Sequence, residues 1–491
     1  MDFEKLTIPE IHQQFHAGKT SAVELVERAF EVIERKEKDL AAFISFDKEE
    51  ALKAAQEVDQ KIAKGEELGI LEGIPFALKG NIVMKDKVVT CGSRILENFV
   101  SPYDATVVKK LKEAGAIVVG MTNMDEFAMG SSTENSFYKK TRNPHDHTRV
   151  PGGSSGGSTT AVAGGEVVFA LGSDTAGSVR QPAAFCGVVG LKPTYGAVSR
   201  YGLVAMASSL DQIGPVTRNI TDCVLVQRAI QGSDVHDSTC VTDKRNNPDY
   251  DLESIQNLGV KDLKIGIPEE YFGKGLDKKV KEKVETVIKF LEKEGAKIEK
   301  VSLPHTDYAI ATYYILSPAE VSSNLSRYDG IRYGYSAITD PDKTTNDLSS
   351  VYLESRKEGF GNEAKRRILV GTFALSSGYY DAYYLKAQKT RTLIRKDFED
   401  VFKKVDLLIT PTTPTPAFKL GAKLDDPLEM YMSDVMTVPA SLAGVPAISL
   451  PCGEIEEGGK KLPIGVQLIG NYFEEAKIFQ AAYRIEKILH S

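Results

Sequence analysis

Two stretches that are rich in glycine and serine contain the residues best suited to chemistry. They are Pro151-Gly-Gly-Ser-Ser-Gly-Gly-Ser158 and Gly172-Ser-Asp-Thr-Ala-Gly-Ser-Val-Arg-Gln-Pro182. Glycine lets a backbone approach a ligand closely, and successive N–H groups in such loops can converge on one negative charge. A buried-looking apolar run at residues 167–171 separates the two stretches, which a flexible surface linker would not contain. We therefore expect a binding or catalytic site here.

Phosphate binding is one chemistry that glycine-rich loops perform. A P-loop ends in Gly-Lys-Ser/Thr, and the dinucleotide-binding loop has the spacing G-x-G-x-x-G. Neither pattern occurs in these stretches. Nucleotide binding by them is therefore disfavoured.

A serine hydrolase with a nucleophile elbow is the second chemistry. Gly152-x-Ser154-x-Gly156 matches G-x-S-x-G, but the elbow needs a strand directly before it and residues 141–150 form a poor strand. None of the seven histidines stands in a catalytic motif. His145-x-His147 lacks the carboxylates and thiols of a metal site, so we expect a surface loop there and no metal.

A serine nucleophile that is served by a lysine is the third chemistry. Ser178 follows a credible strand at residues 167–171 and precedes an expected helix that begins near Gln181. Lys79 ends an apolar strand at residues 74–78, where burial would lower its pKa and leave a usable neutral fraction. The N–H groups of residues 175–178 can then stabilise one oxyanion. We favour this third arrangement.

The same residues resemble a known family. Gly73-Ile-Pro-Phe-Ala-Leu-Lys-Gly-Asn-Ile82 and the two glycine–serine stretches, in this order, are similar to the motifs of the amidase signature family. That family uses a Ser–cis-Ser–Lys triad. The resemblance implies that Ser178 is the nucleophile, that Ser154 is a bridging serine with a cis peptide bond, and that Lys79 is the base. It also implies an α/β fold in which a large mixed β-sheet is covered by helices on both faces.

The oxyanion-binding turn contains one departure from the family pattern. The resemblance assigns binding of the amide and its oxyanion to Thr175, Ala176 and Gly177. Ala176 stands where the family usually has glycine. A methyl group there would constrain the turn if the residue had a positive φ. We expect the change to be tolerated.

Five further segments resemble one branch of this family, whose members are the glutaminase subunits of tRNA-dependent amidotransferases. These segments are residues 90–98, 126–135, 199–203, 208–215 and 322–330. Within this resemblance, Ser178 attacks the side-chain amide of glutamine and releases ammonia. A partner subunit uses the ammonia to convert Glu-tRNA(Gln) to Gln-tRNA(Gln) in an ATP-dependent reaction.

A glutamine pocket has a physical requirement that can be compared with this resemblance. Glutamine is a zwitterion, so a specific pocket needs a cation for the α-carboxylate and an anion for the α-amine. The family's glutamine contacts correspond to Tyr313, Arg367 and Asp434, and Met129 and Ser131 are expected to line the same pocket. Taken alone, Arg367 and Asp434 would be interpreted as a surface arginine and a loop aspartate.

The resemblance also implies partners. They are a tRNA-binding subunit of the kinase type and a small third subunit, with tRNA contacted mainly through the former. ATP and Mg²⁺ would bind to the partner, and this chain would need no cofactor of its own. A stand-alone amidase that hydrolyses a small carboxamide is an alternative. A scaffold that has lost activity is another, although the intact Lys79, Ser154 and Ser178 argue against it.

Composition and charge set wider limits on function. The 491 residues carry a formal net charge of −7, which disfavours a broad nucleic-acid-binding face. The five scattered cysteines form no C-x-x-C pair and indicate reduced thiols. The polar N-terminus lacks an apolar signal core, and no run of about 18 apolar residues occurs. We therefore expect a cytoplasmic protein with no membrane association.

The elements that must position the site alternate between strands and helices, as in an α/β protein. Strands are expected at residues 74–78, 116–119, 167–171, 264–267, 297–303, 407–409, 445–450 and 464–469. Helices are expected at residues 21–33, 47–65, 106–113, 280–291 and from 474 onward. Residues 187–193 are expected to form a turn-rich path, and residues 453–461 the loop of a hairpin.

We interpret residues 1–491 as a single domain with four parts. Residues 1–70 form a helical N-terminal part, and residues 71–231 form the core with Lys79, Ser154 and Ser178. Residues 232–257 form a polar connection, and residues 258–491 supply the remainder of the sheet and the expected glutamine pocket.

Overall fold

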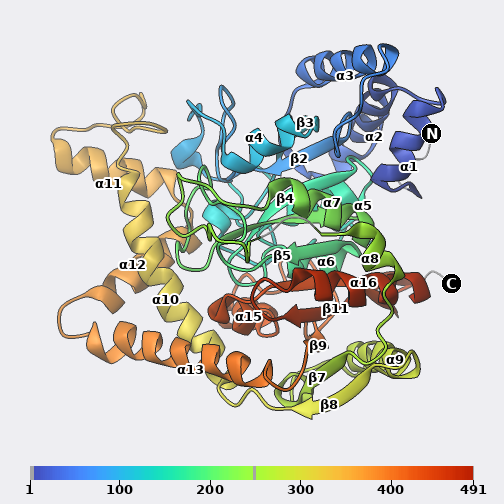
Figure 1. The fold of residues 1–491 in the computed structure, drawn as a ribbon. Coiled ribbons are helices and arrows are strands. Elements are labelled where there is room, and N and C mark those ends of the chain that lie inside the picture. The colour runs from blue at the N-terminus through green and yellow to red at the C-terminus, as the bar shows by residue number, and fades with distance from the viewer. Residues whose placement is uncertain (1–4, 247–249, 490–491) are drawn as a thin grey trace.

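A single mixed sheet runs through the protein (Figure 1). The computed structural model describes residues 5–246 and 250–489. Eleven strands of the described residues form this sheet. In sheet order they are β1 (Phe43–Phe46), β3 (Ile117–Thr122), β2 (Pro75–Lys79), β4 (Phe169–Asp174), β6 (Gln212–Thr217), β5 (Val189–Lys192), β10 (Ala447–Glu457), β11 (Lys460–Gly470), β9 (Leu407–Pro411), β7 (Lys264–Pro268) and β8 (Lys297–Val301).

The pairing of β5 with β10 joins the two halves of the sheet. These strands are antiparallel, with Leu191 opposite Ile448. The strands before β5 in the chain and those after residue 258 therefore share one hydrogen-bonded surface. The division of the chain into four parts stays a prediction.

The parallel strands β3, β2 and β4 position the candidate site. β2 pairs in parallel with β3 on one side and with β4 on the other. Because the carboxyl ends of parallel strands meet at one edge of a sheet, the segments that follow these three strands are brought together there. Lys79 is the last residue of β2, and Asp174 is the last residue of β4.

Helices surround the sheet. They are α1 (Ile8–His16), α2 (Ala22–Leu40), α3 (Lys48–Ala63), α4 (Thr106–Glu113), α5 (Gly156–Ala163), α6 (Arg180–Cys186), α7 (Ile220–Ile230), α8 (Leu252–Asn257), α9 (Lys278–Lys293), α10 (Ala309–Asn324), α11 (Leu348–Gly359), α12 (Asn362–Leu375), α13 (Lys386–Val401), α14 (Pro427–Tyr431), α15 (Val438–Ala443) and α16 (Glu475–Leu489). Helices α10 to α13 lie together at the left of Figure 1, away from the helices α1 to α3. None of the described helices combines the length and apolar character needed to cross a bilayer.

Alternation along β9 shows that helices cover both faces of this half of the sheet. Leu407 and Ile409 belong to an apolar cluster with residues of α9 and α16. Leu408 belongs to another cluster with residues of α10, α13 and α15. Since successive side chains of a strand point to opposite faces, α9 and α16 lie on one side and α10, α13 and α15 on the other.

Capping signals account for the first helices. Ser21 and Glu24 form the expected capping box at the start of α2, with the Ser21 hydroxyl accepting from the Glu24 N–H at 3.1 Å. The Asp47 carboxylate accepts from the Glu50 N–H at 3.1 Å and starts α3. The eight expected strands are present, although the strand expected at 297–303 ends at Val301.

Two local expectations were wrong, and one helix was not expected. Residues 189–192, expected within a turn-rich path, form the central strand β5. The hairpin of β10 and β11 extends much further than expected, so its loop is only Gly458 and Gly459. Residues 156–163 form the buried helix α5, which composition did not indicate because small residues dominate it. Tertiary packing overrode the weak local propensities in each case. Residues 247–249 of the polar connection lie outside the described residues.

Candidate active site

Lys79 is fully buried at the end of β2. Its Nζ donates hydrogen bonds to Ser154 Oγ at 2.7 Å, to Ser173 Oγ at 3.0 Å and to the Ser173 carbonyl at 3.2 Å. Burial lowers the pKa of Lys79 to about 7, against the opposing charges of Asp125, Asp174 and Asp211. A substantial neutral fraction therefore exists near neutral pH, as a general base requires.

Ser154 is buried between the loop after β3 and helix α5. The Gly153–Ser154 peptide bond is cis, as the family resemblance implies. The Gly153 N–H donates to Gln181 Oε1 at 3.0 Å, and the Ser154 carbonyl accepts from the Asp125 N–H at 3.3 Å. These contacts fix the serine with its hydroxyl toward Lys79.

Ser178 lies between β4 and α6 and is 6% exposed. Its carbonyl accepts from the Ser155 N–H at 3.0 Å, which brings it beside the segment that holds Ser154. Its hydroxyl forms no hydrogen bond with Ser154 or with any other described residue. Lys79 is thus hydrogen-bonded directly to Ser154. Ser178 lies beside the segment that holds Ser154, and its hydroxyl has no hydrogen-bond partner among the described residues.

The backbone of residues 175–178 can accommodate an oxyanion. Within the described part of the chain, the four N–H groups of these residues donate to no protein acceptor. Gly177 has φ of 143°, and a Cβ on it would lie 2.1 Å from Thr437 Oγ1, so only glycine fits there. Ala176 is not among the residues with positive φ, which explains how alanine can replace the usual glycine.

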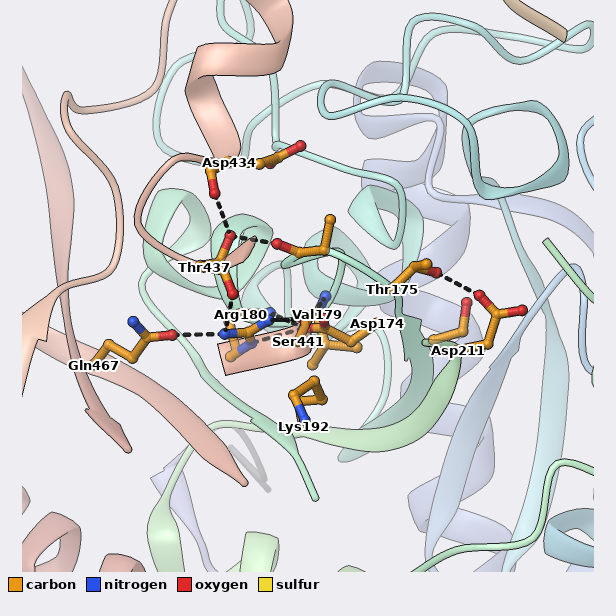
Figure 2. A network of polar contacts seen from close by, with 12 residues as sticks. Asp174, Thr175, Val179, Arg180, Lys192, Asp211, Asp434, Thr437, Ser441 and Gln467 are labelled. Carbon is orange, nitrogen blue, oxygen red and sulfur yellow. Dashed lines mark hydrogen bonds and ion pairs between the residues drawn. The ribbon is translucent and has the colours of Figure 1, made fainter. Parts of the chain in front are cut away.

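A buried ionic network supports this turn (Figure 2). Arg180 and Asp174 are fully buried and form two parallel hydrogen bonds of 2.9 Å. Asp174 Oδ2 also accepts from the N–H groups of Val179 and Arg180, at 3.2 and 3.3 Å. Burial acts to raise the pKa of Asp174, but the charge and hydrogen bonds of Arg180 hold it below its usual value. The ion pair therefore closes the loop that carries Ser178.

Partners from distant elements complete the network. Arg180 donates to Gln467 Oε1 at 2.7 Å, to Ser441 Oγ at 2.8 Å and to the Thr437 carbonyl at 3.0 Å. The Thr437 hydroxyl in turn donates to the Ala176 carbonyl at 2.6 Å. Hydrogen bonds to β11 and to the segment around α15 thus fix the conformation of the turn.

Thr175, expected at the amide end of the substrate, is fixed by another carboxylate. Its hydroxyl donates to Asp211 Oδ1 at 2.7 Å. The second oxygen of Asp211 accepts from the N–H groups of Met206 and Ala207, at 2.9 and 3.0 Å. Asp211 therefore orients Thr175 from the segment before β6, and Figure 2 shows this pair on the other side of the turn from Thr437.

Asp434 and Ser131 come together as the resemblance implies. The Ser131 hydroxyl donates to Asp434 Oδ2 at 2.5 Å, while Asp434 Oδ1 is buried and has no partner among the described residues. Burial raises the pKa of Asp434 to about 7, although Ser131 and the charge of Arg367 act to lower it. Met129 is buried on the same loop as Ser131. An unpartnered carboxylate oxygen in this position suits the ammonium group of a ligand.

Arg367 on α12 is buried and points inward, contrary to a surface location. Its Nε donates to Glu363 Oε1 at 2.8 Å, and its guanidinium lies 5.3 and 5.5 Å from the ring centroids of Tyr314 and Tyr431. Its two terminal nitrogens form no hydrogen bond with any described residue. These two nitrogens are therefore available for the parallel hydrogen bonds by which an arginine binds a carboxylate.

Tyr313 is buried beside these charges. Burial raises the pKa of its phenol, while the charge of Arg367 opposes the rise and that of Asp434 adds to it. The ring of Tyr313 lies 4.9 Å from that of Tyr314, which contacts the Arg367 guanidinium, and Tyr431, the other ring that contacts Arg367, lies three residues before Asp434. The predicted residues Tyr313, Arg367 and Asp434 therefore lie close together.

Several supporting residues were missed at the sequence level. They are Asp125, Ser173, Asp211, Glu363, Tyr314, Tyr431 and Thr437. Asp174 and Arg180 lie within the second glycine–serine stretch but received no role. Their signal was present, because an acidic and a basic residue within a run of small residues must find a partner when buried. Ser173 also lies in that stretch, and the other supporting residues are distant in sequence; none of them gave a comparable signal.

The surface loop expected at His145 and His147 is confirmed. The His145 ring approaches the Cys186 carbonyl at 2.9 Å and lies in a loop, and His147 is exposed. No group of three or more His, Cys, Asp or Glu side chains suited to hold a metal ion occurs among the described residues.

Comparison with protein families and curated proteins supports the resemblance to amidases. The family described as Amidase matches residues 24–479. A glutamyl-tRNA(Gln) amidotransferase subunit from Carboxydothermus hydrogenoformans is 55% identical over 487 residues, which cover 99% of this chain and 98% of that protein. The corresponding protein from Heliobacterium modesticaldum is 53% identical, with coverage of 98% and 96%.

Solved structures with this fold include both an amidotransferase component and a peptide amidase. The crystal structure of the corresponding glutamyl-tRNA(Gln) amidotransferase subunit from Thermotoga maritima is 45% identical, with a TM-score of 0.79 and coverage of 99% of this chain and 95% of that chain. The native peptide amidase from Stenotrophomonas maltophilia is 28% identical, with a TM-score of 0.81 and coverage of 100% and 98%.

Proposed function

This chain belongs to the amidase family, and we propose that it is the glutaminase subunit of a glutamyl-tRNA(Gln) amidotransferase. Its likeness to relatives of that description extends over nearly its whole length. The structural observation that carries the glutamine assignment is the occurrence, in the same region, of a buried guanidinium with two free terminal nitrogens on Arg367 and of an unpartnered carboxylate oxygen on Asp434. A pocket for a neutral amide has no need of these opposite charges.

The chemical step begins with a proton transfer. Neutral Lys79 accepts the proton of the Ser154 hydroxyl, and Ser154 takes the proton of the Ser178 hydroxyl. The Ser178 Oγ then attacks the side-chain amide carbon of glutamine. Ser154 then gives one proton to the leaving nitrogen and recovers one from Lys79, the C–N bond breaks, and ammonia departs. Water then hydrolyses the acyl-enzyme to glutamate and free Ser178.

The turn at residues 175–178 stabilises the charge that develops in this step. Its free N–H groups bind the oxyanion, and Thr175 contacts the amide end. Because the ion pair of Asp174 with Arg180 and the hydroxyl of Thr437 hold the turn, these donors are preorganised. Preorganised donors do not need to reorganise as the charge forms, which lowers the barrier.

Partner subunits receive the ammonia. The relatives are each described as one subunit of an amidotransferase, which implies partner subunits for this chain as well. We assign the binding of Glu-tRNA(Gln), ATP and Mg²⁺ to a kinase-type partner, and we include a small third subunit in the complex. The class of reaction on the partner is the amidation of an activated γ-carboxylate.

An exposed apolar patch supports the existence of a partner. The α12 patch consists of Leu369, Val370, Phe373, Tyr379, Tyr380 and Tyr383, all more than a third exposed. Phe373 and Tyr379 contact each other with ring centroids 4.3 Å apart. Leu369 is two residues from Arg367 on α12 and hence points to the opposite side of the helix. A contiguous exposed patch of this kind is typical of a protein interface.

One set of measurements tests the proposal. The chain is purified with and without the candidate partner subunits, and ammonia release from glutamine and formation of Gln-tRNA(Gln) are followed. We expect glutamine-dependent formation of Gln-tRNA(Gln) only with the partners. Hydrolysis of simple amides without any preference for glutamine would support the stand-alone amidase instead.

The α12 patch has its own test. Leu369→Asp combined with Phe373→Asp should prevent co-purification with the partners. Val235→Asp is the matched control, since Val235 is 95% exposed and lies outside the patch. Equal binding by both variants would exclude the patch as the partner interface.

A further inference from the structure

Glu126 is a buried carboxylate that the proposed reaction does not use. It lies in the loop after β3, is 3% exposed, and precedes the pocket residues Met129 and Ser131. Its two oxygens accept from the Gly361 N–H at 3.1 and 2.9 Å. Gly361 is the N-cap residue of α12 and supplies no capping side chain of its own. A distant carboxylate thus binds the N–H of the N-cap residue, as the N3 carboxylate of a capping box does, and lies at the positive end of the helix dipole.

The Ser93 hydroxyl strengthens this junction. It donates to Glu126 Oε1 and also approaches the Gly359 carbonyl at 3.1 Å. Glu126 and Ser93 therefore hold the connection between α11 and α12 from one side. A Cβ on Gly361 would lie 2.6 Å from Glu126 Oε2, which shows how closely the two segments approach.

The ring of Phe127 packs against the same connection between α11 and α12. Its centroid lies 5.0 Å from that of Tyr328 and 5.7 Å from that of Phe360, the residue before Gly361. Phe127 and Ala128 have φ of 46° and 63°, a left-handed conformation that is costly for residues other than glycine. The contacts that the Glu126 and Phe127 side chains make with the connection between α11 and α12 stabilise this conformation. They thereby fix the path of the chain toward Met129 and Ser131.

The other end of the junction leads to Arg367. Glu363 is in the first turn of α12, accepts from Arg367 Nε at 2.8 Å, and also accepts from the Tyr431 hydroxyl at 3.0 Å. The position of the first turn of α12 therefore sets the position of the guanidinium. Ser131, on the other side, donates to Asp434. Glu126 thus connects the start of α12, which holds Arg367, with the loop whose Ser131 binds Asp434.

We propose that Glu126 is a positioning residue for glutamine: it holds α12, with Arg367, against the loop of Met129 and Ser131 and so sets the separation between the cation and the anion of the pocket. This inference rests on the proposed glutaminase function. Glu126 acts on binding of the α-carboxylate and α-amine and leaves the Lys79–Ser154–Ser178 chemistry unchanged.

Two variants test this role from the two sides of the junction. Burial raises the pKa of Glu126 to about 7, so the assays are made at pH 8, where its carboxylate is ionised. Glu126→Gln then removes the carboxylate charge with little change of shape, and Gly361→Ala pushes the carboxylate away without altering it. In the complete complex, each should raise KM for glutamine about tenfold while kcat stays within about threefold, because displacement of the guanidinium weakens binding and not bond cleavage. Hydrolysis of butyramide, which lacks both charged groups, should not change.

A matched control separates positioning from general stability. Asp222 is a buried carboxylate that accepts from the Ile8 N–H at 2.8 Å, at the first residue of α1 and outside the pocket. Asp222→Asn should leave KM unchanged. If Glu126→Gln does not fold, Gly361→Ala decides the question.

The outcomes distinguish this inference from the function on which it rests. An unchanged KM in folded Glu126→Gln or Gly361→Ala, or an equal loss of activity on glutamine and butyramide, would overturn the role of Glu126. A wild-type complex without glutaminase activity, or an Arg367→Met variant with unchanged KM, would overturn the proposed function instead.

Discussion

Asp174 and Arg180 are six residues apart, fully buried, and joined by two hydrogen bonds of 2.9 Å across the turn that carries Ser178. The same carboxylate accepts from the N–H groups of Val179 and Arg180. One ion pair therefore ties the end of β4 to the start of α6. The conformation of the oxyanion turn between them depends on this pair.

Arg180→Met should destabilise the fold and reduce kcat. Removal of one partner leaves the other charge buried without compensation, which costs about 3–5 kcal/mol. The free energy of unfolding is measured by urea titration, and kcat is measured with glutamine. Arg395→Met is the control, because its pair with Glu399 is exposed and should contribute less than about 1 kcal/mol. Equal stability of the two variants would contradict the role given to Arg180.

Lys79 should determine the pH dependence of kcat. Its pKa is lowered to about 7 by burial, and only the neutral form can accept a proton. The value of kcat should therefore fall as the pH decreases below about 7 and reach a plateau above it. Lys79→Met and Lys79→Arg should each reduce kcat by about 10⁴-fold or more, since neither side chain provides a base.

Lys192 provides the matched control for Lys79. It is also buried with a pKa lowered to about 7, but it donates to the carbonyls of Pro193 and Val445 and not to Ser154. Lys192→Met should therefore retain the pH profile of kcat. If kcat of Lys192→Met no longer changed with pH near 7, while kcat of Lys79→Arg still did, Lys192 and not Lys79 would be the base.

Asp434 should determine the pH dependence of KM. Burial raises its pKa to about 7, and only the ionised form attracts the ammonium group of glutamine. KM for glutamine should therefore rise as the pH falls below about 7. Asp434→Asn should raise KM about 10- to 100-fold at pH 8 and remove this dependence, because a charge-assisted hydrogen bond is lost. If the KM profile of Asp434→Asn matches that of the wild type, Asp434 does not bind the amine.

Gly177→Ala should reduce kcat by about 10²- to 10³-fold, the usual effect of losing an oxyanion donor. The added methyl group would meet Thr437 Oγ1 at 2.1 Å in a backbone conformation that alanine avoids. Ala176→Gly is the neighbouring control and should retain activity within about threefold, since Ala176 does not have a positive φ. Initial rates at saturating glutamine measure both effects.

The sequence by itself determined the chemistry and most of the elements. The order of Lys79, Ser154 and Ser178 in motif-like surroundings indicated an amidase-type serine enzyme, and periodic apolar residues indicated the strands that carry Lys79 and precede Ser178. These conclusions depend on local signals. Strand β5 and helix α5 gave weaker signals, because small residues and glycine have little intrinsic preference and their structure is imposed by neighbours.

Only the tertiary structure decided which charged residues are buried and what they face. Arg367 and Asp434 looked like ordinary surface residues in the sequence, yet both are buried, and Arg367 on α12 contacts Tyr431 in the segment that carries Asp434. Asp174, Asp211, Thr437 and Glu126 act through contacts with residues that are up to 261 positions away. Such contacts leave no periodic pattern, because their partners are chosen by how the strands and helices pack and not by spacing along the chain.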